Sequence, residues 1–193
     1  MIDFKGKSDK ELVKLSLLDS DNFLFLMEKY KEPLKRYIWR ISAVTKEEAE
    51  DILQEVFIKV YRNLYDYDGE FSFSSWIYRI THNETISCIR KMKVRPQLIS
   101  VEDDEVGAFV QMLPGDADVE NEVKLKELSK IVRRMLANLS ERYRTVLILR
   151  YLEDKSYEEI SDILQKSIGT VSTLINRAKK QFKDMAIVNK SLL

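Results

Sequence analysis

Apolar residues return every three or four positions along most of this chain, and the clearest run lies between Ala49 and Leu64. Its members are Ala49, Ile52, Leu53, Val56, Phe57, Val60, Tyr61 and Leu64. This spacing matches one face of a helix with about 3.6 residues per turn. Thr45 and Glu48 stand three positions apart, which is the spacing of a capping box at a helix start. We therefore predict a helix over Thr45–Leu64 that buries this face.

The same periodicity continues through the rest of the chain and predicts an all-α fold. Helices are expected over 8–18, 19–42, about 73–94, about 119–139, from 140, from 156 and over 170–185. Only five Gly and three Pro occur in 193 residues, which favours long helices with few turns. The chain has no apolar run of membrane-spanning length, its first residues lack the apolar core of a signal peptide, and Cys88 has no disulfide partner. These features predict a protein of the reducing cytoplasm.

A second stripe lies beside the apolar face of the predicted helix at Thr45–Leu64. It consists of Asp51, Gln54, Glu55, Ile58 and Arg62. One interpretation is a solvated charged face, which is the common role of such a stripe. Ile58 favours another, because an apolar residue among acids suits a basic partner helix that also offers apolar surface.

Three motifs in this chain resemble one known family. They are DILQEVF at Asp51–Phe57, FSFSSWIYRITHN at Phe71–Asn83 and the basic IRKMKVR at Ile89–Arg95. Together they are similar to bacterial sigma factors of the sigma-70 family, and the short length resembles the extracytoplasmic-function (ECF) group. The resemblance covers about residues 8–183. It implies that the helix carrying DILQEVF docks on the β′ clamp helices of core RNA polymerase, through Asp51, Gln54 and Glu55, with Ile58 and Arg62 beside them.

The second motif sits in a segment rich in aromatic and polar residues. Composition alone allows a turn with core aromatics, or exposed aromatics such as Tyr67, Phe71 and Phe73 that stack on unpaired bases beside cations. In ECF sigma factors this loop captures a flipped-out base of the −10 element, and Tyr67 and Asn83 match the pocket positions. An Asn amide can both donate and accept at a base edge. The resulting −10 candidates are Tyr67, Phe71, Arg79, Asn83, Arg90, Lys91 and Lys93.

Charge is distributed in blocks although the formal net charge is zero. Phe71–Gln97 carries +4, Leu98–Glu122 carries −8 without a single Lys or Arg, and Lys166–Lys183 carries +5. Local basic clusters bind phosphates, whereas overall neutrality weakens indiscriminate binding. We predict a first domain over 1–96, an acidic linker over 97–118 and a second domain over 119–193. The linker is either a solvated spacer or, as the resemblance implies, a segment that occupies the RNA exit channel of polymerase.

Two short apolar patterns near the C-terminus predict a helix-turn-helix. Ser156 and Glu159 mark the first helix start, Lys166–Gly169 forms the turn, and the second helix starts at Thr170. A plain helical hairpin is the alternative. The outward residues of the second helix favour DNA, because hydroxyls, an amide and cations read base edges and bind phosphates. The stretch is also similar to the −35-reading helix of the family, and the candidates are Thr170, Ser172, Thr173, Asn176, Arg177 and Lys180.

The chain departs from the family pattern at five positions. Glu84 replaces an apolar residue and Ser87 replaces Asp beside the −10 candidates, while Gln165 replaces Gly in the turn. Ser172 and Leu174 stand where basic residues are usual in the −35 helix. Fewer cations predict weaker −35 binding or an altered sequence preference.

Three functions are compatible with these patterns. The first is an ECF sigma factor that binds core polymerase, places it on −35 and −10 elements and promotes melting by trapping an unstacked base. The second is an autonomous regulator that uses only the helix-turn-helix, and the third is a helical interaction protein. An enzyme is disfavoured, because the chain has one His, one Cys and no phosphate-cradling Gly-rich motif. The resemblance also implies the polymerase β flap and an anti-sigma factor as partners, and we expect no metal or cofactor.

Overall fold

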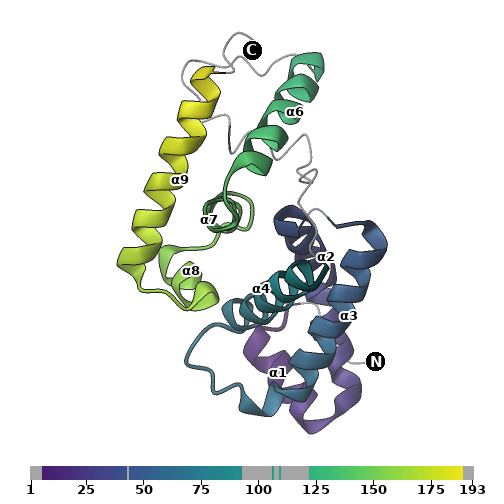
Figure 1. The fold of residues 1–193 in the computed structure, drawn as a ribbon. Coiled ribbons are helices and arrows are strands. Elements are labelled where there is room, and N and C mark those ends of the chain that lie inside the picture. Colours follow the sequence, from purple (N-terminus) through teal and green to yellow (C-terminus); the bar gives the residue numbers. More distant parts are fainter. Residues whose placement is uncertain (1–5, 43, 93–105, 107–108, 110–121, 189–193) are drawn as a thin grey trace.

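The computed structural model describes residues 6–42, 44–92, 106, 109 and 122–188. Within these ranges the chain is helical and contains no strand, which confirms the predicted all-α class. Figure 1 shows two groups of helices that follow each other along the chain. The first group contains α1 (Asp9–Leu18), α2 (Phe23–Ser42), α3 (Lys46–Arg62) and α4 (Phe73–Met92), with 3₁₀ turns at Ser20–Asn22 and Leu64–Asp66. The second group contains α6 (Glu122–Asn138), α7 (Glu141–Tyr151), α8 (Tyr157–Leu164) and α9 (Ile168–Val188).

Capping boxes start three of these helices, as the sequence predicted. In α1, α3 and α8 the hydroxyl of Ser8, Thr45 or Ser156 accepts from a backbone N–H three residues on. At α3, the Thr45 N–H donates to Glu48 Oε2 at 2.8 Å, and the Glu48 N–H donates back to Thr45 Oγ1 at 3.2 Å. Each box satisfies two N–H groups that the helix itself leaves unpaired, which fixes where the helix begins.

The first group packs around α2, which contacts α1, α3, α4 and the 3₁₀ turn at Ser20–Asn22. The buried face of α3 is the predicted one with a single exception. Tyr61 was predicted inward but remains 46% exposed. Its ring meets the edge of Phe23 with a centroid distance of 5.2 Å, so it borders the core without entering it.

The aromatic segment at the start of α4 contributes to the core. Phe73 is 2% exposed and contacts Tyr30, Tyr67 and Trp76 with centroid distances of 5.5 to 5.6 Å. Of the two interpretations that composition allowed for this segment, Phe73 therefore follows the one with core aromatics. Four aromatic rings gather here in edge-to-face and tilted contacts, which favour burial of the whole set.

The second group is organised around α7, which is buried on nearly all sides. Residues 144–149 of α7 are all buried, because α7 contacts α8 and α9 within its group and α2 of the first group. A helix enclosed in this way needs apolar residues around its circumference. The expected acidic linker lies mostly outside the described residues, but Val106 and Phe109 are fully buried. Phe109 packs on Phe182 at 5.6 Å and on Tyr151 at 6.3 Å between ring centroids.

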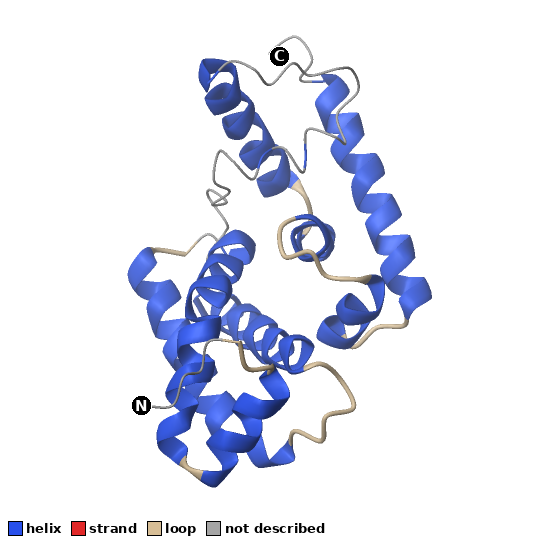
Figure 2. Ribbon diagram, turned by 180° about the vertical axis from the view of Figure 1, so that it is seen from behind, coloured by secondary structure: helices blue, strands red, loops and turns tan. Residues whose placement is uncertain are grey.

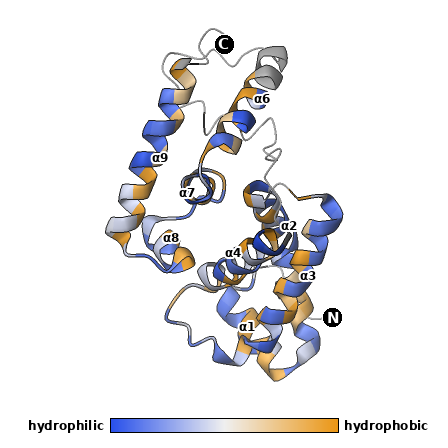
Figure 3. Cartoon of the chain, in the orientation of Figure 1, coloured by the Kyte–Doolittle hydropathy of each residue, from blue (hydrophilic) through white to orange (hydrophobic). Residues whose placement is uncertain are grey.

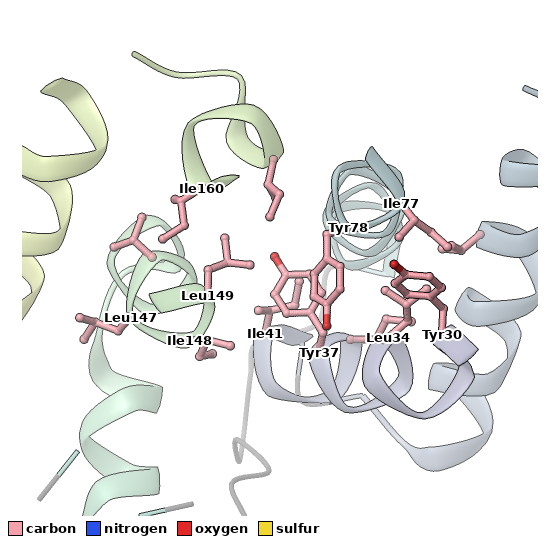
Figure 4. Packing of buried hydrophobic residues seen from close by; sticks show 14 of the residues in the cluster. Tyr30, Leu34, Tyr37, Ile41, Ile77, Tyr78, Leu147, Ile148, Leu149 and Ile160 are labelled. Carbon is pink, nitrogen blue, oxygen red and sulfur yellow. The ribbon is translucent and has the colours of Figure 1, made fainter. Parts of the chain in front are cut away.

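The two groups are in direct contact through α4 with α8 and α2 with α7. Figure 4 shows Ile148 and Leu149 of α7 beside Ile41 and Tyr37 of α2. Seen from behind in Figure 2, the same two groups of helices remain adjacent at these contacts. The buried apolar residues of both groups thus form one continuous cluster, although the sequence predicted two separate modules.

Hydrophobic and hydrophilic residues alternate along the helices in Figure 3, as expected for helices that each bury one face. In the described part of the chain, no helix is long and apolar enough to cross a membrane.

Replacement of Gln165 by Gly should stabilise the protein by about 0.5–1 kcal/mol. Gln165 ends α8 in the left-handed conformation (φ 52°, ψ 50°), where a Cβ is sterically unfavourable and glycine is not. Chemical denaturation of both proteins measures the difference in free energy of unfolding. Lys166→Gly is the control, because Lys166 has no positive φ and its replacement should not stabilise. A Gln165→Gly protein with unchanged or lower stability would contradict the account.

Candidate polymerase and DNA interfaces

The acidic and apolar stripe on α3 is a continuous exposed surface. Asp51, Gln54, Glu55, Ile58 and Arg62 are all exposed, and Ile58 is 41% exposed. Their spacing of three or four positions places them along one side of α3, because the opposite side carries the core residues. The capping box at Thr45 fixes where α3 begins, and therefore which turns of the helix carry this stripe.

The stripe borders a groove between α2 and α3 that the sequence did not reveal. The groove has a volume of about 1150 Å³, and Gln54, Ile58 and Arg62 line it together with residues of α2. Leu24 of α2 lines it too and is 63% exposed. The signal was present in the sequence, since Leu24 is apolar yet lies off the buried stripe of α2. The groove widens the candidate docking surface and makes it more apolar.

The loop before α4 brings three of the −10 candidates together. Tyr67 donates its hydroxyl to the Phe71 carbonyl at 2.8 Å, and the Arg79 guanidinium lies 6.0 Å from the centroid of the Phe71 ring. Phe71 is 37% exposed, whereas the ring of Tyr67 packs on Phe73 and Trp76. Burial raises the pKa of Tyr67, so its hydroxyl remains a proton donor at neutral pH. An exposed ring with a cation above it is suited to stack on a base.

The other −10 candidates lie further along α4. Asn83, Arg90 and Lys91 are exposed and line a cleft of about 560 Å³. Arg79, Asn83 and Arg90 lie along the same side of the helix. Lys93 lies outside the described residues.

The two residues of α4 that depart from the family pattern differ in whether they line the cleft. Glu84 forms an ion pair with Lys59 of α3, so its carboxylate points away from the cleft. Ser87 lines the cleft itself. Of these two departures, only Ser87 therefore lines the cleft.

The helix-turn-helix candidates lie at the exposed side of α9. Thr170, Thr173, Asn176, Arg177 and Lys180 are exposed, and Ser172 is half-buried. The Thr173 hydroxyl donates to the Gly169 carbonyl at 2.9 Å, and the hydroxyls of Thr170 and Ser167 lie 2.8 Å apart. Leu174, predicted inward, is half-buried and lines the cleft opposite α4.

Comparison with known protein families finds one match in each of the two groups of helices. The family description "Sigma-70 region 2" matches residues 26–95, and "Sigma-70, region 4" matches residues 129–182. The ECF RNA polymerase sigma factor SigW of Bacillus subtilis is 34% identical over 186 residues, which cover 91% of this chain and 97% of the relative. The chain belongs to the ECF RNA polymerase sigma factors. The ECF RNA polymerase sigma-E factor of Haemophilus influenzae is also 34% identical, over 86% of this chain and 88% of its own.

Two solved structures share the fold of this sigma factor. CnrH in complex with the cytosolic domain of CnrY superposes with a TM-score of 0.65 at 19% identity, covering 91% of this chain and 95% of that chain. The sigma factor RpoE in complex with the anti-sigma factor NepR from Bartonella quintana gives a TM-score of 0.60 at 20% identity, covering 87% and 98%. As an ECF sigma factor, the protein acts in transcription initiation.

The cleft of this sigma factor is strongly basic. Arg90 and Lys91 of α4 face Arg142 and Lys166 of the second group, and Glu141 is the only acid in the lining. Among the described residues, none of these four cations forms an ion pair. Asn83 and the apolar residues Ile86 and Leu174 also line the cleft. Such a lining can bind phosphates and pack a base at the same time.

His82 borders this cleft but is a packing residue. Its Nδ1 lies 3.1 Å from the Tyr37 hydroxyl, and burial, helped by the nearby charges of Arg90 and Lys166, lowers the pKa of His82 to about 4. Within the described ranges, no group of His, Cys, Asp and Glu side chains could hold a metal ion. We thus assign His82 a packing role.

His82 should remain neutral until the pH falls to about 4, because its pKa lies well below the ordinary histidine pKa of about 6.5. Because it is the only His of the chain, its imidazole signals can be followed by NMR without ambiguity. As the pH falls, the unfolded chain takes up this proton before the folded protein does. The free energy of unfolding that His82 contributes above about pH 6.5 is therefore lost between pH 6.5 and pH 4. Over this pH range, the free energy of unfolding of a His82→Gln variant should fall by about 2–3 kcal/mol less than that of the wild-type protein. A His82 pKa near 6.5 would show that the ring is not buried.

Proposed function

We propose that this ECF sigma factor binds core RNA polymerase through the α3 stripe and the adjoining groove, and reads promoter DNA with α4 and α9. The assignment follows the domain division predicted from the sequence, with 1–96 as the −10 domain, 97–118 as the linker and 119–193 as the −35 domain. The observation that carries it is the exposed stripe on α3, where Ile58 stands among Asp51, Gln54 and Glu55. An autonomous regulator that uses only the helix-turn-helix has no need of this surface.

The polymerase partner is a basic helical surface with apolar residues, of the kind that the β′ clamp helices provide in this family. Acids at Asp51 and Glu55 suit its cations, while Ile58 and the groove suit its apolar side chains. Arg62 ends the stripe with a positive charge, which adds orientation because a reversed partner helix would meet repulsion. The β flap is the expected contact of the second domain.

The −10 element is read by Tyr67, Phe71, Arg79 and Asn83, with Arg90, Lys91 and Lys93 along the phosphates. Phe71 beneath the Arg79 guanidinium offers a stacking surface, and the exposed Asn83 amide offers a donor and an acceptor. A base held there is removed from its duplex stack, so binding energy is spent on strand separation. This step requires positioning and binding, and we assign the protein no catalytic chemistry.

The −35 element is read by α9. Its exposed residues, from Thr170 and Thr173 to Asn176, Arg177 and Lys180, project from one side of a helix whose other side is buried, and Ser172 borders them. A helix presented in this manner fits the major groove, with Arg177 and Lys180 as the main cationic contacts. The proposed setting is the cytoplasm, with an anti-sigma factor as the expected negative regulator.

Asp51→Arg combined with Glu55→Arg should abolish polymerase binding while the fold remains. The double change turns two attractive charges into two repulsive ones at the centre of the proposed surface. Pull-down with core polymerase measures binding, and circular dichroism checks the helix content. Glu32→Arg with Asp184→Arg makes the same change in net charge at exposed sites outside the stripe and should leave binding intact. Equal retention of core polymerase by both double variants would refute the proposed interface.

Arg177→Ala should weaken binding to a −35 duplex by about 1–3 kcal/mol, the usual range for a base-contacting arginine. Run-off transcription with core polymerase on pooled genomic fragments first identifies a promoter, and fluorescence anisotropy at fixed salt then measures the affinity. Arg134→Ala removes the same charge from an exposed site on α6 and should cost much less. If the two variants bind equally, Arg177 is not a specific contact.

A further inference from the structure

The basic cleft between the two groups of helices brings together cations from both of them. Arg90 and Lys91 belong to α4, Arg142 to α7 and Lys166 to the turn between α8 and α9. All four are exposed, and within the described part of the chain none of them forms an ion pair. Like charges repel each other across such a cleft, so an anion bound between them would remove an unfavourable interaction.

The charges of the two sides converge inside the cleft. Burial, followed by the charges of Arg90 and Lys166, lowers the pKa of His82, whose ring lines the cleft. Arg90 lies on α4, as His82 does, whereas Lys166 comes from the second group. One imidazole is thus within electrostatic reach of cations from both sides, so a single small anion in the cleft can interact with both.

Local contacts restrain the backbone at Lys166 and the guanidinium of Arg142. The Lys166 N–H donates to the Ser161 carbonyl at 3.1 Å, and the Ser161 hydroxyl donates to the Lys166 carbonyl at 2.5 Å. The Arg142 guanidinium lies 4.9 Å from the centroid of the Tyr143 ring. A ligand that binds to restrained cations loses less affinity to the ordering of side chains.

The remaining lining suits the other parts of a nucleotide. Ile86, Leu164 and Leu174 contribute apolar surface on which a base can pack. Asn83 offers an amide that can both donate and accept at a base edge. Glu141 repels phosphates but accepts hydrogen bonds, so it suits a ribose hydroxyl or a base amino group. The volume of about 560 Å³ lies within the usual range for small-molecule sites.

We propose that this cleft binds a nucleoside polyphosphate. The phosphates lie between the two cations of α4 and the pair formed by Arg142 and Lys166, and the base packs on Leu164 and Leu174. This site goes beyond the proposed promoter contacts, because Arg142 and Lys166 belong to neither of the DNA-reading sets. It gives the chain a second binding function, with a free nucleotide as the ligand.

Nucleotide and −10 DNA should exclude each other, and this consequence alone rests on the proposed function. Both ligands use Asn83, Arg90 and Lys91, so each must weaken the binding of the other by the same factor. Free nucleotide thereby becomes a regulator of promoter binding.

Isothermal titration calorimetry of the full chain with ATP and with GTP, at fixed salt, tests the site. Saturable binding of one nucleotide per chain is expected. Arg142→Gln combined with Lys166→Gln should weaken this binding at least about 10-fold, because two charge-assisted contacts to phosphate are lost. Lys14→Gln combined with Arg134→Gln removes the same charge from exposed sites outside the cleft and should change the affinity less than about twofold.

The contact with the base has a test of its own. Tripolyphosphate should displace ATP, because it uses the same cations. Leu174→Ala should weaken ATP binding about 3- to 10-fold and leave tripolyphosphate binding unchanged, since only the base loses a contact. The imidazole signals of His82, the only His of the chain, should shift in the NMR spectrum when ATP is added. Circular dichroism checks that all variants keep the helix content of the wild type.

Absence of saturable ATP and GTP binding, or equal binding by the two double variants, would overturn the nucleotide site. An ATP affinity that Leu174→Ala leaves unchanged would reduce the cleft to a site for any polyphosphate and would overturn the proposal as well. If bound ATP leaves the affinity for a random-sequence single-stranded oligonucleotide unchanged, Arg90 and Lys91 do not belong to the DNA interface, while the nucleotide site stands. Failure of the wild-type chain to support transcription by core polymerase would refute the proposed function instead, whatever the calorimetry shows.

Discussion

The packing of α2 is the constraint on which the rest of this structure depends. Tyr37, fully buried in α2, contacts the Tyr78 ring at 5.2 Å between centroids and places its hydroxyl beside His82. One helix thereby aligns α3 on one side, α4 on another and α7 of the second group. Apolar burial of this kind is non-directional, so the register depends on the few polar bonds within it.

This arrangement divides each helix between stability and recognition. Each of α3 and α9 buries one face and exposes the opposite one. The exposed face of α3 carries the stripe around Ile58, and that of α9 carries the polar row around Arg177. The function that we propose for this sigma factor requires well-placed surfaces on a stiff support. The Lys59–Glu84 ion pair serves both purposes, because it joins α3 to α4 and directs a carboxylate away from the proposed DNA face.

Local structure was readable from the sequence because its causes are local. The capping boxes at Ser8, Thr45 and Ser156 were predicted from three-residue spacings, and the outward placement of Ile58 from its offset to the apolar stripe. Tyr61 was misplaced and Phe73 could not be assigned, because an aromatic at the edge of a helix can be buried or exposed according to which rings surround it. Leu24 and the groove were missed for a related reason, since a groove exists only once two helices are side by side.

The sequence by itself determined the helices, their buried faces and the charged residues offered to partners, since periodicity and capping act within a few residues of chain. Only the tertiary structure decided that Arg40 and Tyr78 meet Glu153, far away along the chain, and that Phe109 of the acidic segment packs on Phe182. No spacing rule predicts such contacts, because they depend on how two helical groups dock. The physical reason is that a charge is tolerated in a dry interface only where the fold supplies its partner.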